Sequence, residues 1–249
     1  MNPHRSRFAR VLFVSLLAVS AGCGRSARSS SEASDQDRER AAELLRDATL
    51  VVRQLAEADI PGSRRERARC AVVIPSMVSG GLVIGARHGR GVVSCRAKAQ
   101  WSGPVFVSIS GGSAGFQAGL ESSDIVMLIM SERAVAQLFR ESFELGADVS
   151  AAAGPVGKGA QASTDTTMTA EILSYARSRG LFAGAQVSGA AMKQDHAATH
   201  ALYGDGPDIH AILAGEVPPP KEAEAFLEQL QATFPPFAEE SRPSVSSLP

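Results

Sequence analysis

The sequence predicts an α+β fold in which a curved, mainly antiparallel and barrel-like sheet is flanked by helices. Short apolar runs separated by glycine and proline recur through the middle of the chain, which is typical of strands joined by tight turns. Helical periodicity is confined to the ends and one central stretch, without the strand–helix alternation that builds a parallel sheet. With 23 glycines and only 5% aromatic residues, we expect small side chains between closely approaching strands.

The charge of the chain limits which classes of function are expected. The formal net charge is −1 and charged residues make up 20% of the chain. A protein that binds nucleic acid usually carries a basic excess. The composition therefore gives no reason to expect a nucleic-acid partner.

Residues 1–22 have the features of a signal peptide. Three arginines (Arg5, Arg7 and Arg10) precede an apolar run over residues 11–21, and no acidic residue interrupts them. The run is about half of the ~20 residues that span a bilayer, so we expect no stable transmembrane helix here.

Small residues lead directly into Cys23, in a pattern that resembles the lipobox of bacterial lipoproteins. In that family the cysteine is diacylated through its sulfur and becomes the new N-terminus. Ser20 departs from the usual aliphatic residue, and an ordinary secretory signal with an incidental cysteine is the alternative. Gly24 stands where an inner-membrane retention signal would have aspartate, which favours the periplasmic side of the outer membrane. Residues 23–34, rich in serine, arginine and alanine, are interpreted as a flexible tether.

The remaining elements are predicted from periodicity and turn residues. Apolar residues at three- and four-residue steps predict a helix over residues 35–58, and the spacing of Ser63 and Glu66 predicts a capping box that starts a short helix. Strands are expected over residues 70–74 (ending at Pro75), 81–87 and 91–96 (a hairpin around 88–90), 105–109, 124–130, 171–177 and 181–188. Further helices are expected from Ser131 to a stop at Gly146, near 195–202, and over 221–234, with a disordered end from 235.

One glycine-rich segment resembles a catalytic motif. Residues 111–115 fit the G-x-S-x-G pattern around Ser113, but a nucleophile elbow needs a strand, a sharp turn and then a helix. Residues 116–124 are short, contain a glycine and lead into another strand. A serine hydrolase at Ser113 is therefore only a distant third hypothesis.

Two further motifs fall short of a cofactor site. His196 and His200 have a zinc-type spacing but lack the H-E-x-x-H glutamate, so we interpret them as surface histidines and expect no metal. Residues 154–159 resemble a phosphate loop, but no serine or threonine follows Lys158. We expect no cofactor, and Lys158 remains available to a phospholipid head group.

Cys70 and Cys95 lie in predicted strands and would both reach an oxidising periplasm. A disulfide and a pair of buried free thiols are both compatible with the sequence.

Several segments in order resemble one family, the SYLF domain. They include R-A-R-C-A-V-V-I-P at 67–75, G-G-L-V-I-G-A-R-H-G-R-G at 80–91, W-S-G-P at 101–104, G-G-S-A-G-F-Q-A-G at 111–119, L-G-A-D at 145–148, A-G-P-V-G at 153–157 and Y-A-R-S-R-G-L-F-A-G at 175–184. The family occurs in bacterial secreted and lipoprotein-like proteins, yeast actin-patch proteins and eukaryotic proteins with Src-homology or FYVE modules. The resemblance covers residues 35–204, and residues 205–249 are interpreted as a helical extension and tail.

The resemblance implies a non-enzymatic, lipid-binding domain, since eukaryotic members are associated with acidic phospholipids and some with actin. We do not transfer actin binding to a chain with a bacterial lipoprotein leader. The family's proposed lipid-contact region matches the segment with the densest basic patch. The predicted lipid-binding residues are Arg64, Arg65, Arg67, Arg69, Lys158, Arg177 and Arg179. A solvated helix face is the alternative for the patch.

The sequence thus predicts an envelope lipoprotein that contacts anionic phospholipid. The alternative is a periplasmic structural or protein-interaction module that is anchored only by the acyl chains on Cys23. Its protein partner is not predicted.

Overall fold

The structure is a computed structural model that describes residues 23–81, 84–98, 100–114, 119–157, 169–178 and 180–235. Its helices are α1 (Cys23–Ala56), α2 (Gly62–Arg67), α3 (Glu132–Leu138), α5 (His196–Tyr203), α6 (Ile209–Leu213) and α7 (Glu224–Thr233), with a 3-10 turn η2 (Lys221–Ala223) before α7. Its strands are β1 (Cys70–Gly81), β2 (Ile84–Ala97), β3 (Gln100–Trp101), β4 (Val105–Ala114), β5 (Gly119–Ile129), β6 (Ser142–Leu145), β7 (Ala151–Ala153), β8 (Ile172–Ser178), β9 (Leu181–Gly184) and β10 (Ala190–Gln194).

The strands form one strongly curled sheet in the order β6-β10-β4-β2-β1-β5-β8-β7. Neighbouring strands are antiparallel except β7 and β8, which are parallel. β6 and β7 lie at opposite ends of this order, yet only residues 146–150 join them, and Leu145 pairs with Val149. Such a short connection spans at most roughly 20 Å, so the sheet must curl until its two ends approach each other. The predicted α+β fold with a curved, mainly antiparallel sheet is confirmed.

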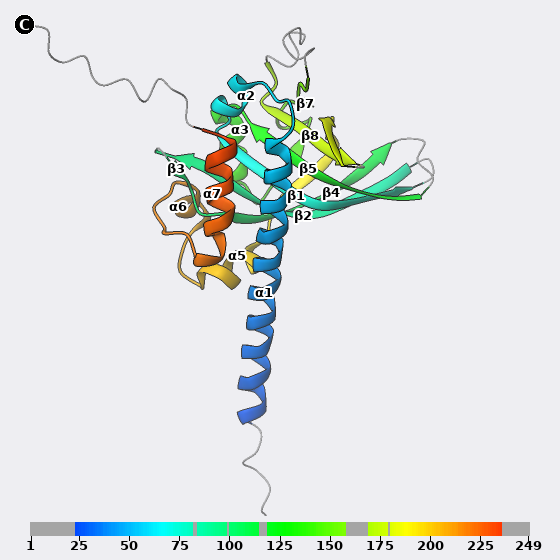
Figure 1. Cartoon of the computed structure of the whole chain (residues 1–249). Coiled ribbons are helices and arrows are strands. Elements are labelled where there is room, and N and C mark those ends of the chain that lie inside the picture. The colour runs from blue at the N-terminus through cyan, green and yellow to red at the C-terminus, as the bar shows by residue number, and fades with distance from the viewer. Residues whose placement is uncertain are drawn as a thin grey trace, which may run out of the picture.

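Both faces of the sheet are buried. α1, α5 and α7 cover one face, and α1 and α7 cross it side by side (Figure 1). Phe106 and Tyr175 pack there among residues of these helices. On the opposite face, Val72 and Met127 pack in a second cluster with residues of α3 and α6. Because successive strand residues point to opposite faces, strands buried on both sides have the continuous apolar runs seen in the sequence.

Cys70 and Cys95 are directly opposite each other on β1 and β2 and form a disulfide. Both cysteines are buried in the cluster on the second face of the sheet. Of the two alternatives for this pair, the structure has the disulfide.

The sequence predicts that the first strand ends at Pro75, but β1 continues beyond this residue. The strand continues to Gly81, with a register shift between Ile74 and Met77 and a positive φ of 50° at Ser76. Proline has no backbone N–H to donate to a neighbouring strand, so within a sheet it is accommodated at a bulge. The Ser76 N–H turns to Asp124 and donates to its Oδ1 at 2.9 Å.

The predicted hairpin around residues 88–90 is wrong, because β2 runs through it as one strand. Glycine is needed there for close packing. A Cβ on Gly89 would lie 2.7 Å from Cγ2 of Ile74, and one on Gly91 would collide with the carbonyl oxygen of Val73. β2 pairs with β1 instead, as far as Gly81 opposite Gly85.

Three helix predictions need correction. The segment predicted as a flexible tether is helical, because α1 begins at Cys23, and Figure 1 shows this part projecting from the body of the domain. α2 begins at Gly62 after Pro61 and has no side-chain cap, so the predicted capping box is absent. α3 ends at Leu138, before the predicted stop at Gly146, because the chain turns to enter β6.

The C-terminal part of the domain packs into the same core as α1. Phe226, Leu230 and Phe234 are fully buried with Val52 and Leu55 of α1, in the region predicted as an extension. Among the described residues, no helix is long and apolar enough to cross a membrane. The predicted signal peptide, Lys158, Arg179 and the tail after residue 235 lie outside the described residues.

Candidate functional site

The four arginines around α2 have different roles. Arg65 is half-buried, and its guanidinium donates to the carbonyl oxygen of Ala58 at 2.5 Å and to that of Ala56 at 3.3 Å. These carbonyls lie at the C-terminal end of α1, where helix carbonyls lack intrahelical partners. Burial lowers the pKa of Arg65, against the opposing influence of Tyr175 and Asp59. Arg65 therefore has a structural role.

Arg69 lies 3.2 Å from Glu132 of α3 in an exposed ion pair. Arg64 and Arg67 differ from it, because the side chain of neither makes a hydrogen bond or an ion pair within the described ranges. Arg67 is exposed and Arg64 is half-buried. These two residues, which we call the arginine face, are the part of the predicted patch whose charge remains uncompensated there.

Arg64 of the arginine face lies close enough to Tyr175 of β8 to influence it electrostatically. The ring of Tyr175 fills the space above Gly154, where a Cβ would collide with it. Burial raises the pKa of Tyr175 to about 12, while the charges of Arg64 and Arg65 act in the opposite direction. The Gly157 N–H donates to the Asp59 carbonyl at 2.9 Å. The fold thus brings together segments about a hundred residues apart in the sequence.

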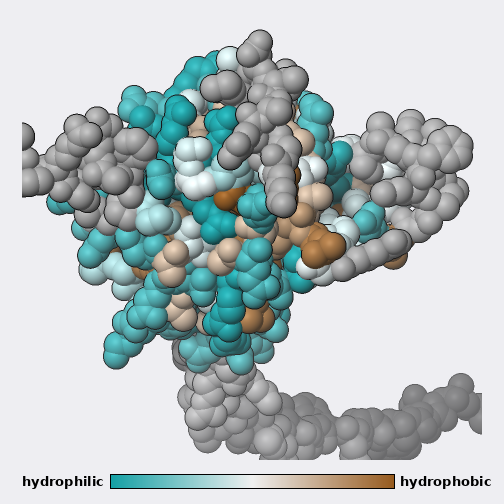
Figure 2. Space-filling view, turned by 45° about the horizontal axis from the view of Figure 1, so that its top comes forward, coloured by the Kyte–Doolittle hydropathy of each residue, from teal (hydrophilic) through white to brown (hydrophobic). Residues whose placement is uncertain are grey.

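The surface at this end of the molecule is mainly hydrophilic. Figure 2 brings the top of Figure 1 forward, where α2 lies, and shows mostly hydrophilic residues, with a hydrophobic area to the right of centre.

Arg177 is not available as a free cation. Its Nη2 lies 2.5 Å from Oδ2 of Asp124, which is directly opposite on β5. The other carboxylate oxygen accepts the Ser76 N–H, so the ion pair closes the bulge in β1. A polar cavity of about 240 Å³ adjoins the pair, lined by Ser76, Ser122, Ser123, Asp124, Arg177 and Gly180. This predicted lipid-binding residue therefore stabilises the sheet.

Sequence reasoning missed Arg96, which connects α2 to the C-terminal part of the domain. Its Nε donates to the Ala68 carbonyl at 2.8 Å, and its Nη2 donates to the Phe234 carbonyl at 3.0 Å. The guanidinium also lies over the indole of Trp101, 4.8 Å from the ring centroid. An arginine at the end of a strand, close to the single tryptophan, was the only signal in the sequence.

Ser113 does not lie at a nucleophile elbow. It is within β4, opposite Gly85 of β2, and the next element in the described part of the chain is the strand β5, from Gly119, rather than a helix. The α/β-hydrolase arrangement needs a helix at that point.

The two candidate histidines face different carboxylates. His196 Nε2 lies 3.1 Å from Glu141, and His200 Nδ1 lies 3.3 Å from Asp205. Both histidines are half exposed. No group of three or more potential metal ligands occurs within the described ranges.

By its fold, this protein is an α+β domain, and its short helix α2 carries the arginine face. Residues 110–233 match the Ysc84 family, described as "Las17-binding protein actin regulator". The chain belongs to this Ysc84 (SYLF) family, and the resemblance found in its motifs is confirmed.

The chain is similar to curated proteins of yeast and mammals. It is 35% identical to Protein YSC84 of Saccharomyces cerevisiae over 182 residues, which cover 71% of this chain and 38% of that protein. It is 32% identical to LAS seventeen-binding protein 3 of Saccharomyces cerevisiae over 182 residues, 71% of this chain and 39% of that protein. It is 30% identical to the human SH3 domain-containing YSC84-like protein 1 over 196 residues, 78% of this chain and 57% of that protein. The chain thus spans less than two-thirds of the length of these relatives, one of which is named as a binding protein.

Proposed function

We propose that this protein is a non-enzymatic lipid-binding domain whose arginine face contacts anionic phospholipid. The observation that carries the proposal is the pair Arg64 and Arg67, which no acidic side chain compensates within the described ranges, although Arg65, Arg69 and Arg177 are all engaged. An arginine close to an anionic membrane surface contributes roughly 1 kcal/mol. Two such residues give a weak, reversible contact that salt screens.

Charge reversal at the arginine face tests the proposal. The double variant Arg64→Glu/Arg67→Glu is expected to bind vesicles rich in phosphatidylglycerol roughly tenfold or more weakly, since attraction is replaced by repulsion at both positions. Its binding should also depend less on salt. Vesicle flotation of the unlipidated chain at several salt concentrations measures both effects.

The matched control is Arg46→Glu/Arg53→Glu, which changes the net charge equally at two exposed positions of α1. It should bind nearly as the wild-type chain does. If both double variants lose affinity equally, net charge and not the arginine face governs binding. If Arg64→Glu/Arg67→Glu binds like the wild type, the face is not the lipid contact.

We further propose that the protein is a bacterial envelope lipoprotein that is anchored through Cys23 on the periplasmic side, with the outer membrane favoured. The lipobox-like pattern before Cys23 supports this. Cys23→Ser is expected to abolish incorporation of labelled palmitate in a bacterial host. Label on the serine variant would contradict lipidation at this cysteine.

A protein partner is the second candidate function. The names of the yeast relatives include a Las17-binding protein, which favours a protein-interaction role for this fold. In that case only the acylated chain would float with vesicles. Flotation of a chain that lacks residues 1–23 therefore separates the two functions.

A further inference from the structure

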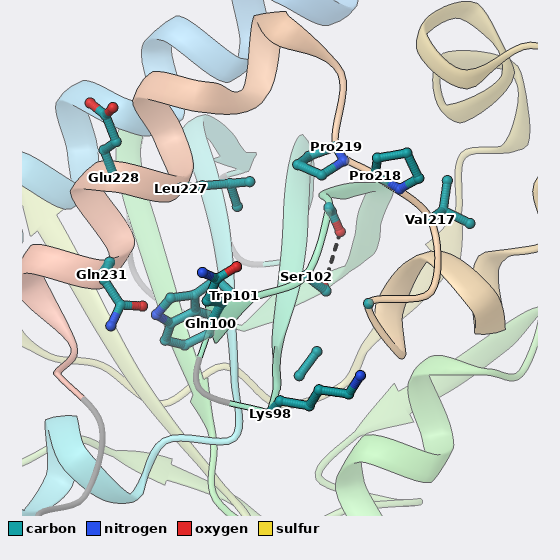
Figure 3. A pocket seen from close by; sticks show the side chains of 13 residues that line it. Lys98, Gln100, Trp101, Ser102, Val217, Pro218, Pro219, Leu227, Glu228 and Gln231 are labelled. Atoms are coloured by element: carbon teal, nitrogen blue, oxygen red, sulfur yellow. Dashed lines mark hydrogen bonds between the residues drawn. The ribbon is translucent and has the colours of Figure 1, made fainter. Parts of the chain in front are cut away.

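A groove lies on the side of the domain formed by β3, α7 and the segment before η2 (Figure 3). Its volume is about 720 Å³, which is within the ~300–1,000 Å³ of small-ligand pockets. Its apolar wall consists of Trp101, Val217, Pro218, Pro219 and Leu227. None of the predicted lipid-binding residues lines it.

Trp101 is the main fixed feature of the groove. The side chain is 6% exposed, and its indole Nε1 is buried without a hydrogen-bond partner within the described ranges. Phe234 contacts the ring edge-on at 5.8 Å between centroids, and Arg96 lies over it. The indole N–H is therefore a positioned donor with an unused hydrogen bond, and a buried donor usually has a partner.

The backbone beneath Trp101 is equally well fixed. Ser102 Oγ donates to the Gly103 carbonyl at 3.0 Å, the bond drawn in Figure 3. It also accepts the Cys95 N–H at 3.1 Å. A Cβ on Gly103 would collide with the Tyr203 hydroxyl. The W-S-G-P motif thus provides a rigid floor, so the groove is largely preformed.

The polar groups at the groove are mainly donors. Lys98, Gln100 and Gln231 line it, and their side chains make no hydrogen bond within the described ranges; Figure 3 shows them on the β3 and α7 sides of the groove. The one carboxylate is Glu228. A ligand that fits this set presents several acceptors, few donors, and apolar rings.

We propose that this groove binds an extended, proline-rich polypeptide segment. Each proline presents a carbonyl acceptor without an N–H, which matches the excess of donors around Trp101. Its ring can pack on the indole and on Pro218 and Pro219, as proline-rich segments pack in aromatic-lined grooves. The polar side chains that line the groove favour this ligand over an acyl chain, because an acyl chain would leave their donors without hydrogen-bond partners.

Trp101 is the only tryptophan in the chain, so its fluorescence reports on this groove alone. Titration of the full chain with the blocked decapeptide of proline should change the Trp101 emission in a saturable way. A blocked glycine–serine decapeptide should give no saturable change. The variant Arg64→Glu/Arg67→Glu should respond as the wild type does, because the groove does not depend on the arginine face.

Two variants test the hydrogen bonds. Gln231→Ala should weaken decaproline binding roughly fivefold, since it removes one side-chain donor. Gln229→Ala is the matched control on the same helix: its side chain donates to Thr233 instead of lining the groove, and its affinity should be unchanged. Trp101→Phe keeps a ring without the N–H, and calorimetry should show a similar loss of affinity.

Three results would overturn the proposal. One is the absence of any saturable response to decaproline at millimolar concentration. Another is equal binding of the glycine–serine peptide, which would mean that proline is not recognised. The third is a saturable response to laurate without one to decaproline, which would assign the groove to an acyl chain.

Discussion

Replacement of Cys70 and Cys95 together by alanine is expected to lower the free energy of unfolding by about 3 kcal/mol. The disulfide joins residues 25 apart in the sequence and restricts the unfolded chain, and closed loops of this size contribute roughly that amount. Both sulfurs are also buried between β1 and β2, so alanine leaves a small void. Urea unfolding of the oxidised wild type and of the double variant measures the difference.

The wild type unfolded in the presence of a reductant is the control for this prediction. It should lose nearly the same free energy as the double variant. Identical stability of the oxidised and reduced wild type would show that the bond contributes nothing to the folded state. The midpoint of unfolding should fall and the slope against urea should rise, because the unfolded chain without the cross-link exposes more surface.

Gly91→Val is expected to destabilise the domain by about 3 kcal/mol or more, because overpacking at a rigid position cannot relax. The added Cβ would meet the carbonyl oxygen of Val73 and the side chain of Ile74. The oxygen belongs to the backbone of β1, which pairs with β2 and β5 on either side and cannot move away. Thermal unfolding followed by circular dichroism measures the effect.

Gly112→Val is the matched control for this second prediction. Gly112 lies in the neighbouring strand β4, and a Cβ there would meet nothing within 4 Å. Its melting temperature should stay close to that of the wild type, since valine also suits a strand. If both variants lose the same stability, backbone entropy and not the clash determines the loss.

The fold could be predicted from the sequence where one local pattern decided the structure. The apolar stripe of α1 and the continuous apolar run of β5 gave correct elements, because each is long and is buried by its own side chains. The prediction failed where the reason lies on another strand. The sequence predicts a turn around Gly89 and the start of a strand at Gly91, yet both glycines make room for β1 within one continuous strand, which no local pattern shows.

The candidate site could be predicted only in part, for a similar reason. The high density of arginines drew attention to the segment of α2. It could not show which of these side chains would form hydrogen bonds or ion pairs within the fold. Arg65 binds the end of α1 and Arg177 binds Asp124, contacts between residues that are up to 53 positions apart. The groove at Trp101 combines β3 with α7, about 130 residues later, and the sequence gives no sign of that approach.

The length of α1 determines which surfaces the protein could reach at one time. A helix of 34 residues is about 50 Å long, more than the thickness of a bilayer. Cys23 lies at the end that projects away from the body, and α2 lies near the other end (Figure 1). An acylated Cys23 and a lipid-bound arginine face would then be two separate contacts. α1 would either lie flat along one membrane or stand upright as a spacer that holds the domain against a second, facing surface.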